Sequence, residues 1–173
     1  MPAPFLFSGE PTAVAALVVS ASGLLAACVT DLRSRRIPNT LNLVLFFGLL
    51  ALHLAQGGLG ALASAGLSFL LCFGLGLVLY LVGALGAGDV KLLGAISVAL
   101  EPALAWQLLA RTALAGGILG VARLLADGNF KNALYGLLSS ARRARAEGSS
   151  VPYGVAIAAG WLWLVTAHVG WTL

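Results

Sequence analysis

Six apolar segments make up most of this 173-residue sequence, and each is bounded by charged residues, proline or glycine. They cover residues 12–29, 39–55, 59–85, 89–100, 102–126 and 151–171. An α-helix needs about 20 apolar residues to cross the roughly 30 Å of hydrocarbon in a bilayer. The first, third, fifth and sixth segments meet this length, the second is marginal and the fourth is short. The pattern therefore predicts helices embedded in lipid.

The composition excludes a water-soluble surface. Sixty per cent of the residues are hydrophobic and only 9% are charged, whereas roughly a quarter are charged in a typical soluble domain. The 22 glycines suit a membrane protein, because small residues let transmembrane helices approach closely. We expect one all-α, membrane-embedded domain over residues 1–173 that contacts membrane lipid. We expect no nucleic-acid partner, because the basic residues form short clusters between apolar segments.

The positions of the basic residues predict how the segments cross. If all six cross, one side of the membrane receives nearly all the Lys and Arg residues: Arg33, Arg35, Arg36, Lys91, Arg123, Lys131, Arg142, Arg143 and Arg145. An excess of positive charge marks the cytoplasmic side. Were the fourth segment not to cross, the charges of loop 127–150 would lie opposite those of the first loop. We therefore expect a six-transmembrane-helix bundle with a short fourth helix, a cytoplasmic loop 127–150, and periplasmic N- and C-termini.

Two of the six acidic residues reach the same side in this topology. Asp31 follows the first apolar segment and Asp89 begins the fourth, so both lie at the cytoplasmic interface. Two carboxyl groups that share a proton can perform acid–base chemistry, because each raises the pKa of the other. Asp89 also fits a helix N-cap, and Asp31 fits an interfacial acid balanced by nearby arginines. Their pairing beside helix breaks favours a functional site.

Other polar residues fit this site less well. Asp127 lies in an Asp-Gly-Asn sequence that is typical of a turn. His53, His168 and Glu101 fall near the outer ends of their segments, most of a membrane thickness from the two aspartates.

Cysteine and serine chemistry is not indicated. Cys28 and Cys72 lie inside apolar segments without a CxxC partner, which predicts neither a zinc site nor a disulfide framework. The serines lack the Gly-x-Ser-Gly setting of a serine intramembrane peptidase. We expect no metal and no cofactor.

Two motifs in order resemble those of a known family. Residues 31–39 (DLRSRRIPN) resemble the first aspartate motif of the type IV prepilin peptidases, and residues 86–93 (GAGDVKLL) resemble their GxGD motif. Residues 151–157 (VPYGVAI) are similar to the segment that opens the family's last helix, although many members have Pro where Val155 stands. This departure favours the tight-adherence (Flp) pilus branch.

The resemblance assigns roles to residues. It implies that Asp31 and Asp89 form a catalytic pair and that Gly86 and Gly88 shape the backbone around Asp89. Lys91 lies next to this pair as an interfacial anchor or a contact for an acidic substrate residue. Pro38 and Asn39 would form a tight entry to the second helix, with Asn39 as its N-cap.

The resemblance also implies an activity and a place. The substrate would be a prepilin or pseudopilin with a short basic leader, cut at the cytoplasmic border of its hydrophobic segment in the bacterial inner membrane. No paired CxxC motifs precede residue 12, so we expect peptidase activity without the methyltransferase activity of many members. The oligomeric state is left open.

Two readings from other functional classes remain. In a small membrane transporter, Asp31 and Asp89 would relay a cation between helices. This reading lacks support, because the sequence has neither an acidic residue near the middle of the membrane nor an inverted repeat. In a noncatalytic component of pilus or secretion assembly, loss of an aspartate would be expected, yet both are present.

Overall fold

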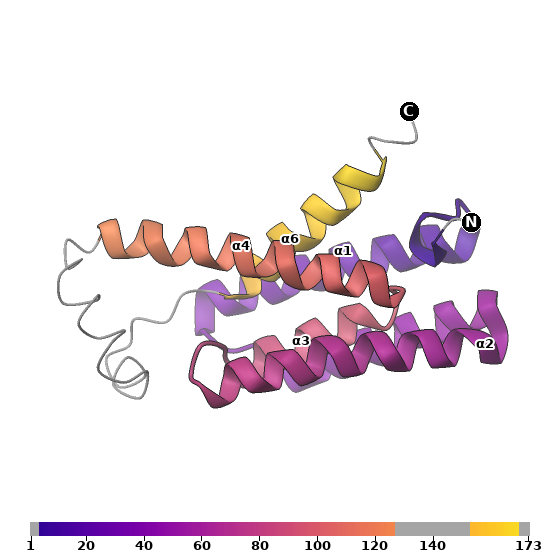
Figure 1. Ribbon diagram of the computed structural model, residues 1–173, viewed down its shortest axis with the longest axis horizontal. Helices are drawn as coiled ribbons and strands as arrows, with labels where there is room; N and C mark the ends of the chain where they lie inside the picture. Colours follow the sequence, from indigo (N-terminus) through magenta and orange to yellow (C-terminus); the bar gives the residue numbers. More distant parts are fainter. Residues whose placement is uncertain (1–3, 127–152, 170–173) are drawn as a thin grey trace.

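The computed structural model describes residues 4–126 and 153–169 of the chain. Within them lie a 3₁₀ turn, η1 (Phe5–Phe7), and the α-helices α1 (Pro11–Ser34), α2 (Asn39–Leu81), α3 (Ala87–Ser97), α4 (Pro102–Ala126) and α6 (Tyr153–Val169) (Figure 1). The predicted all-α fold is confirmed for these residues. Asp127 and the predicted loop 127–150, with four of the basic residues, lie outside the described residues.

The longest helix, α2, folds back on itself at a glycine. Gly58 has φ 57° and ψ −151°, a non-helical conformation that side chains oppose. Phe46, before this break, packs edge to face on Phe69, after it, with ring centroids 5.3 Å apart. The two arms of α2 therefore run side by side in opposite directions (Figure 1). They correspond to the second and third apolar segments, which the sequence predicted as separate helices.

The short helix α3 forms the centre of the bundle. Every residue from 92 to 100 is buried. At its C-terminal end, Ser68 Oγ donates a hydrogen bond to the carbonyl oxygen of Leu100 (2.7 Å), and His53 Nδ1 lies 2.7 Å from that of Val98. Val98 is the C-cap of α3 and Leu100 lies three residues after Ser97, where carbonyl groups have no partner within the helix; these side chains, one from each arm of α2, satisfy them.

The prediction of six membrane spans is corrected by the helix lengths. Among the described residues, three helices are long and apolar enough to cross a membrane: α1, α2 and the 102–122 part of α4. The break at Gly58 leaves two predicted segments inside one helix. α3 has only 11 residues, and α6 is apolar but shorter than a full span.

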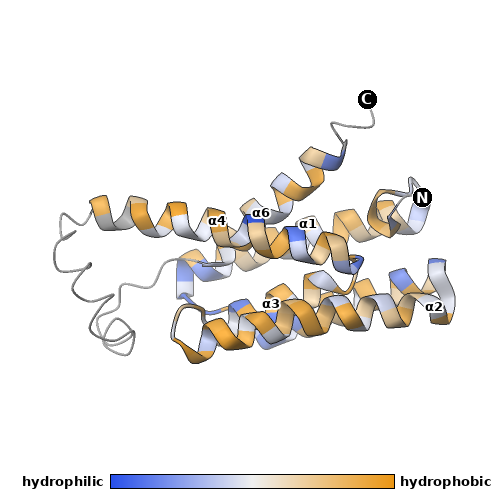
Figure 2. Ribbon diagram, in the orientation of Figure 1, coloured by the Kyte–Doolittle hydropathy of each residue, from blue (hydrophilic) through white to orange (hydrophobic). Residues whose placement is uncertain are grey.

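The outer surface of the helices is apolar. Large hydrophobic side chains are exposed on every long helix, including Val18 (62%), Val44 (69%), Leu70 (66%) and Ile118 (68%). Figure 2 shows hydrophobic residues along the helices rather than on one inward face. Such continuous apolar surface is unfavourable in water and favourable in hydrocarbon. The chain is a membrane protein.

The N-terminal turn η1 packs across one end of the bundle. Phe5 stacks on His53 with ring centroids 4.4 Å apart, and its N–H donates to Glu101 Oε1 (2.9 Å). Phe7 stacks on His168 at 4.7 Å. His53, His168 and Glu101 thus gather at this end, and the C-terminal end of α1 lies at the other (Figure 1).

Arg111 is a cation inside the apolar helix α4. It was missed in the sequence because only the charges at the borders of the apolar segments were counted. Its Nη1 donates to Gln107 Oε1 one turn earlier in α4 (2.9 Å). Its guanidinium carbon lies 5.9 Å from the ring centroid of Trp163 in α6. The charge therefore has both a hydrogen-bond acceptor and an aromatic face, and these contacts lower the free-energy cost of a charge in an apolar setting.

Candidate active site

Asp31 faces the start of α6. The sequence ended the first helix at residue 29, but α1 continues to Ser34, so Asp31 lies within it and is only 7% exposed. Its Oδ2 accepts a hydrogen bond from the Gly154 N–H (3.0 Å). The first N–H groups of a helix lack partners within the helix, and its N-terminus favours negative charge. The end of α1 is therefore joined to the start of α6 through this carboxylate.

Gly154 makes this approach possible. A β-carbon at this position would lie 3.0 Å from Asp31 Oδ2 and 3.2 Å from Asp31 Cβ. Both contacts are tighter than is usual for a β-carbon, so Asp31 or α6 would have to shift by a few tenths of an ångström. The glycine of the third predicted motif therefore favours the close packing of Asp31, a role that the sequence did not reveal.

Asp89 binds the backbone ahead of its own helix. Gly86 occupies the N-cap position of α3, and its N–H donates to Asp89 Oδ2 (3.1 Å). Asp89 is therefore the third residue of the helix. The N-cap position, which the sequence also allowed for Asp89, belongs to Gly86 instead. Its carboxylate reaches back one turn, as an acidic side chain at this position often does.

The two glycines of the GxGD motif provide space. A β-carbon at residue 86 would lie 2.7 Å from Asp89 Oδ2, so Gly86 leaves room for the carboxylate. A β-carbon at residue 88 would lie 3.2 Å from the Cβ of Ile37, so Gly88 lets the turn between α1 and α2 approach α3. Gly86 has φ −81°, which other residues adopt, and so its need is for space rather than for an unusual backbone.

The start of α2 packs on the start of α3. Pro38 is the N-cap residue of α2 and Asn39 its first residue, so the prediction of Asn39 as N-cap is wrong. Instead, Asn39 Oδ1 accepts a hydrogen bond from Lys91 Nζ (2.9 Å). One turn later, Asn42 Nδ2 donates to the carbonyl oxygen of Gly88 (3.3 Å).

The sequence reasoning missed Asn42. Its spacing of three residues from Asn39 puts both amides on one face of an otherwise apolar helix, and that spacing was the available signal.

Burial and charge couple the two aspartates. Burial, and next the negative charge of Asp31, raise the pKa of Asp89 from an ordinary 3.8 to about 6, while the hydrogen bond from the Gly86 N–H acts in the lowering direction. Asp89 lies outside the three helices that are long enough to span a membrane. The structure thus brings Asp31 and Asp89 close enough for one charge to act on the other, at one end of the bundle.

This arrangement suits acid–base chemistry. One carboxyl group keeps its proton to near-neutral pH, and a second carboxylate lies nearby with a backbone donor. Such a pair can take a proton from water and give one to a substrate. Among residues 4–126 and 153–169, no group of three or more His, Cys, Asp or Glu side chains is placed to hold a metal ion.

The model of the type IV leader peptidase family matches residues 18–122, which is more than half of the chain and includes both aspartate motifs. The chain belongs to the type IV leader peptidase family. Membership implies a peptidase that acts on prepilin-type substrates. The third motif lies beyond the matched residues. No curated protein and no solved structure matches the chain.

Proposed function

We propose that this member of the leader peptidase family is an intramembrane aspartyl endopeptidase whose catalytic pair is Asp31 and Asp89. The main support is the raised pKa of Asp89, which has its causes in burial and in the neighbouring charge of Asp31. A carboxyl pair used only for helix capping would gain nothing from a mutual repulsion. In a hydrolase, the same repulsion keeps one proton available for donation.

The contacts favour different roles for the two groups. The Gly154 N–H holds the Asp31 carboxyl group at the start of α6, and we assign Asp31 as the general base because Asp89 takes the role of the acid. Asp31 takes a proton from water, and the water oxygen attacks the scissile carbonyl carbon. Neutral Asp89 donates its proton to the carbonyl oxygen as the tetrahedral intermediate forms. Collapse of the intermediate breaks the C–N bond. The leaving nitrogen takes the proton that Asp31 received from water, and a hydroxyl group of the gem-diol returns a proton to Asp89, which restores the pair.

These roles predict a pH dependence. Asp89 must be neutral to donate its proton, and its pKa is about 6. We expect the rate of cleavage to fall as pH rises through this value. The measurement is the initial rate of prepilin cleavage by purified enzyme between about pH 5 and pH 8. A rate that instead rises steadily across this range would contradict the role of Asp89 as the acid.

The substrate we propose is a prepilin or pseudopilin with a short basic leader before an apolar segment. Arg33 lies in the last turn of α1, two residues after Asp31, and Arg35 caps this helix in the left-handed conformation (φ 53°). An excess of basic residues marks the cytoplasmic face of the bacterial inner membrane, so the site would cut the leader there. Val155 in the third motif supports the Flp pilus branch.

The deciding experiment is cleavage of a co-reconstituted prepilin by the wild type, Asp31→Asn and Asp89→Asn. Asparagine keeps an oxygen that accepts the N–H bonds from Gly154 and Gly86, so both variants should fold. We expect each to lower the rate by about 10²- to 10⁴-fold, as loss of a general acid or base does. Glu10→Gln, an exposed acid at the opposite end, is the matched control. Wild-type rates in both variants would favour the transporter or assembly reading.

A further inference from the structure

The site described above has one proton donor, Asp89, for the carbonyl oxygen of the substrate. This oxygen gains negative charge as water attacks, and it can accept two hydrogen bonds because it has two lone pairs. A second fixed donor at such an oxygen lowers the barrier, and loss of one usually costs about 10²- to 10³-fold in rate. A donor of this kind has to lie close to Asp89.

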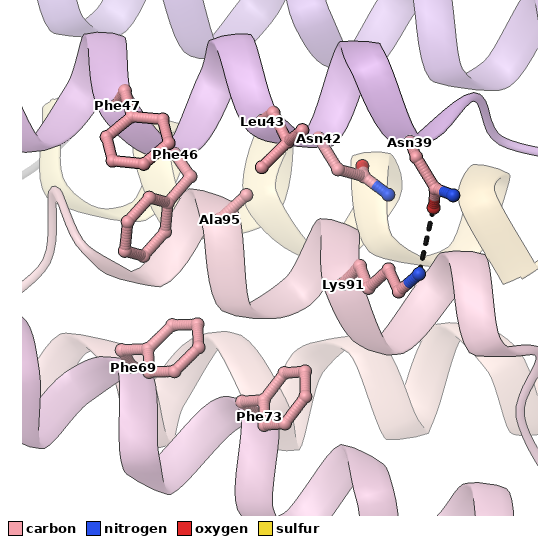
Figure 3. A pocket seen from close by; sticks show the side chains of 9 residues that line it. All are labelled: Asn39, Asn42, Leu43, Phe46, Phe47, Phe69, Phe73, Lys91 and Ala95. Atoms are coloured by element: carbon pink, nitrogen blue, oxygen red, sulfur yellow. Dashed lines mark hydrogen bonds between the residues drawn. The ribbon is translucent and has the colours of Figure 1, made fainter.

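Lys91 is the cation nearest to Asp89 in the sequence, but it does not face the catalytic pair. Residues two positions apart in an α-helix point about 200° apart. Lys91 Nζ donates instead to Asn39 Oδ1 (2.9 Å), as Figure 3 shows. Both residues line an apolar groove between α3 and the arms of α2, which neither Asp31 nor Asp89 lines. The second donor therefore has to come from another element.

Tyr153, the first residue of α6, lies beside the catalytic pair. The residue after it, Gly154, donates its N–H to Asp31 Oδ2 (3.0 Å). Burial, and next the negative charge of Asp89, raise the pKa of the Tyr153 hydroxyl above its ordinary value. The side chain thus lies near enough to Asp89 for that charge to act on it. The phenol keeps its proton at neutral pH and is a hydrogen-bond donor.

The ring of Tyr153 has a fixed place against α4. A β-carbon at residue 116 would lie 3.0 Å from its Cε1 and 3.4 Å from its Cδ1, so Gly116 leaves room for one edge of the ring. The side chain is only partly buried, and no hydrogen bond joins its hydroxyl to another of residues 4–126 and 153–169. Packing therefore holds the hydroxyl in place, and its proton is available to a ligand.

We propose that Tyr153 is a third catalytic residue, whose hydroxyl donates a hydrogen bond to the carbonyl oxygen of the scissile bond. Asp89 gives its proton to one lone pair of this oxygen, and the hydroxyl binds the other. The hydroxyl keeps its own proton throughout, so the step needs no further acid or base. This proposal rests on the proposed function and deepens it. Tyr153 lies beyond residues 18–122, which the family model matches.

Two other roles for Tyr153 predict different results. If only its ring mattered, phenylalanine would serve equally well, because ring carbon atoms make the contact with Gly116. If its hydroxyl acted only on ionised Asp89, it would lower the pKa of that carboxyl group, and its removal would move the pH dependence of cleavage.

The first test is Tyr153→Phe, which keeps the ring and removes the hydroxyl. We expect kcat for prepilin to fall about 10²-fold at every pH at which the wild type cleaves. KM, the thermal midpoint and the pH at which the rate falls should stay those of the wild type, because the lost bond forms only in the transition state. A wild-type kcat would overturn the proposal. So would an unchanged maximal rate with a shifted pH dependence.

The second test moves the ring and keeps the hydroxyl. Gly116→Ala puts a β-carbon against the ring edge, so the ring has to shift by a few tenths of an ångström. Since a misplacement of about 1 Å costs about 10²-fold, we expect kcat to fall several-fold. In Tyr153→Phe the same change should have little further effect, because the hydroxyl is already absent. Equal falls in both backgrounds would overturn the proposal.

Gly117→Ala is the matched control for Gly116→Ala, because its β-carbon meets nothing within 4 Å, and it should leave kcat unchanged. Failure of this proposal can be told from failure of the proposed function. Wild-type cleavage by Asp31→Asn and Asp89→Asn refutes the proposed function. Loss of cleavage in both, with a wild-type kcat in Tyr153→Phe, refutes the role of Tyr153 alone.

Discussion

Replacing Asp31 with asparagine should lower the pKa of Asp89. The negative charge of Asp31 is the second cause of the raised pKa, after burial. The amide in Asp31→Asn is neutral, so it removes the charge and leaves the burial of Asp89 in place. We therefore expect the pKa of Asp89 to fall below about 6 but to stay above its ordinary 3.8.

The size of the effect has an upper limit. The difference between 3.8 and about 6 corresponds to roughly 3 kcal/mol of preference for the neutral form at about 1.36 kcal/mol per pH unit. Burial is the larger cause and stays in place, so removal of the Asp31 charge should release only part of it. Gly86→Ala should act in the opposite direction, because its β-carbon displaces Asp89 Oδ2 from the Gly86 N–H that lowers the pKa.

The assay is the pH dependence of carbodiimide labelling at Asp89. Carbodiimides react with neutral carboxyl groups, and mass spectrometry of proteolytic fragments separates label on Asp89 from label on Asp31. The midpoint of the labelling curve gives the pKa in wild type, Asp31→Asn and Gly86→Ala.

Glu10→Gln should leave this midpoint unchanged, because Glu10 is an exposed acid at the opposite end of the bundle. An unchanged midpoint in Asp31→Asn would refute the coupling between the two aspartates. It would also remove the main support for a catalytic pair.

Three further predictions concern folding and rate. Gly154→Ala should displace the Asp31 carboxylate and lose a charged hydrogen bond worth about 1.5–3 kcal/mol. This loss should lower initial cleavage rates roughly 10- to 150-fold. The control is Gly117→Ala, whose β-carbon meets nothing within 4 Å, and it should leave the rate unchanged. Because burial and the charge of Asp31 raise the pKa of Asp89, its ionisation destabilises the fold; stability is full below pH 3.8 and is lost as pH rises through about 6. Asp89→Asn should therefore raise the thermal midpoint in detergent near pH 7.5 and leave it unchanged at low pH. Phe5→Ala removes a buried ring, so it should lower the free energy of unfolding by about 3–5 kcal/mol and with it the thermal midpoint. Cleavage should persist at low temperature, because Phe5 lies at the opposite end of the bundle from Asp31.

The sequence predicted the helices well where lipid contact defines them. The fifth apolar segment, 102–126, coincides with α4, and the short fourth segment was recognised as a short helix. Hydropathy was a poorer guide at the end of α1, where residues 30–34 are helical although all but Leu32 are polar. Hydropathy reports where a chain leaves the hydrocarbon, whereas a helix ends where its backbone hydrogen bonds end.

The two aspartates could also be predicted to meet, because charge patterning put the end of one helix and the start of another on one side of the membrane. Their detailed partners could not. Asp31 binds Gly154, which lies 123 positions away, and Asn42 binds the carbonyl group of Gly88, 46 positions away.

The sequence by itself determined the solvent of this protein, its helices and its two motifs, because hydropathy and charge are properties of single residues and short segments. Only the tertiary structure decided which faces touch. A glycine such as Gly154 or Gly86 matters for the atom that its missing β-carbon leaves room for, and that atom is known only once the helices are packed. The contact between Phe46 and Phe69 is decided in the same way, because the break at Gly58 brings the two arms of α2 together.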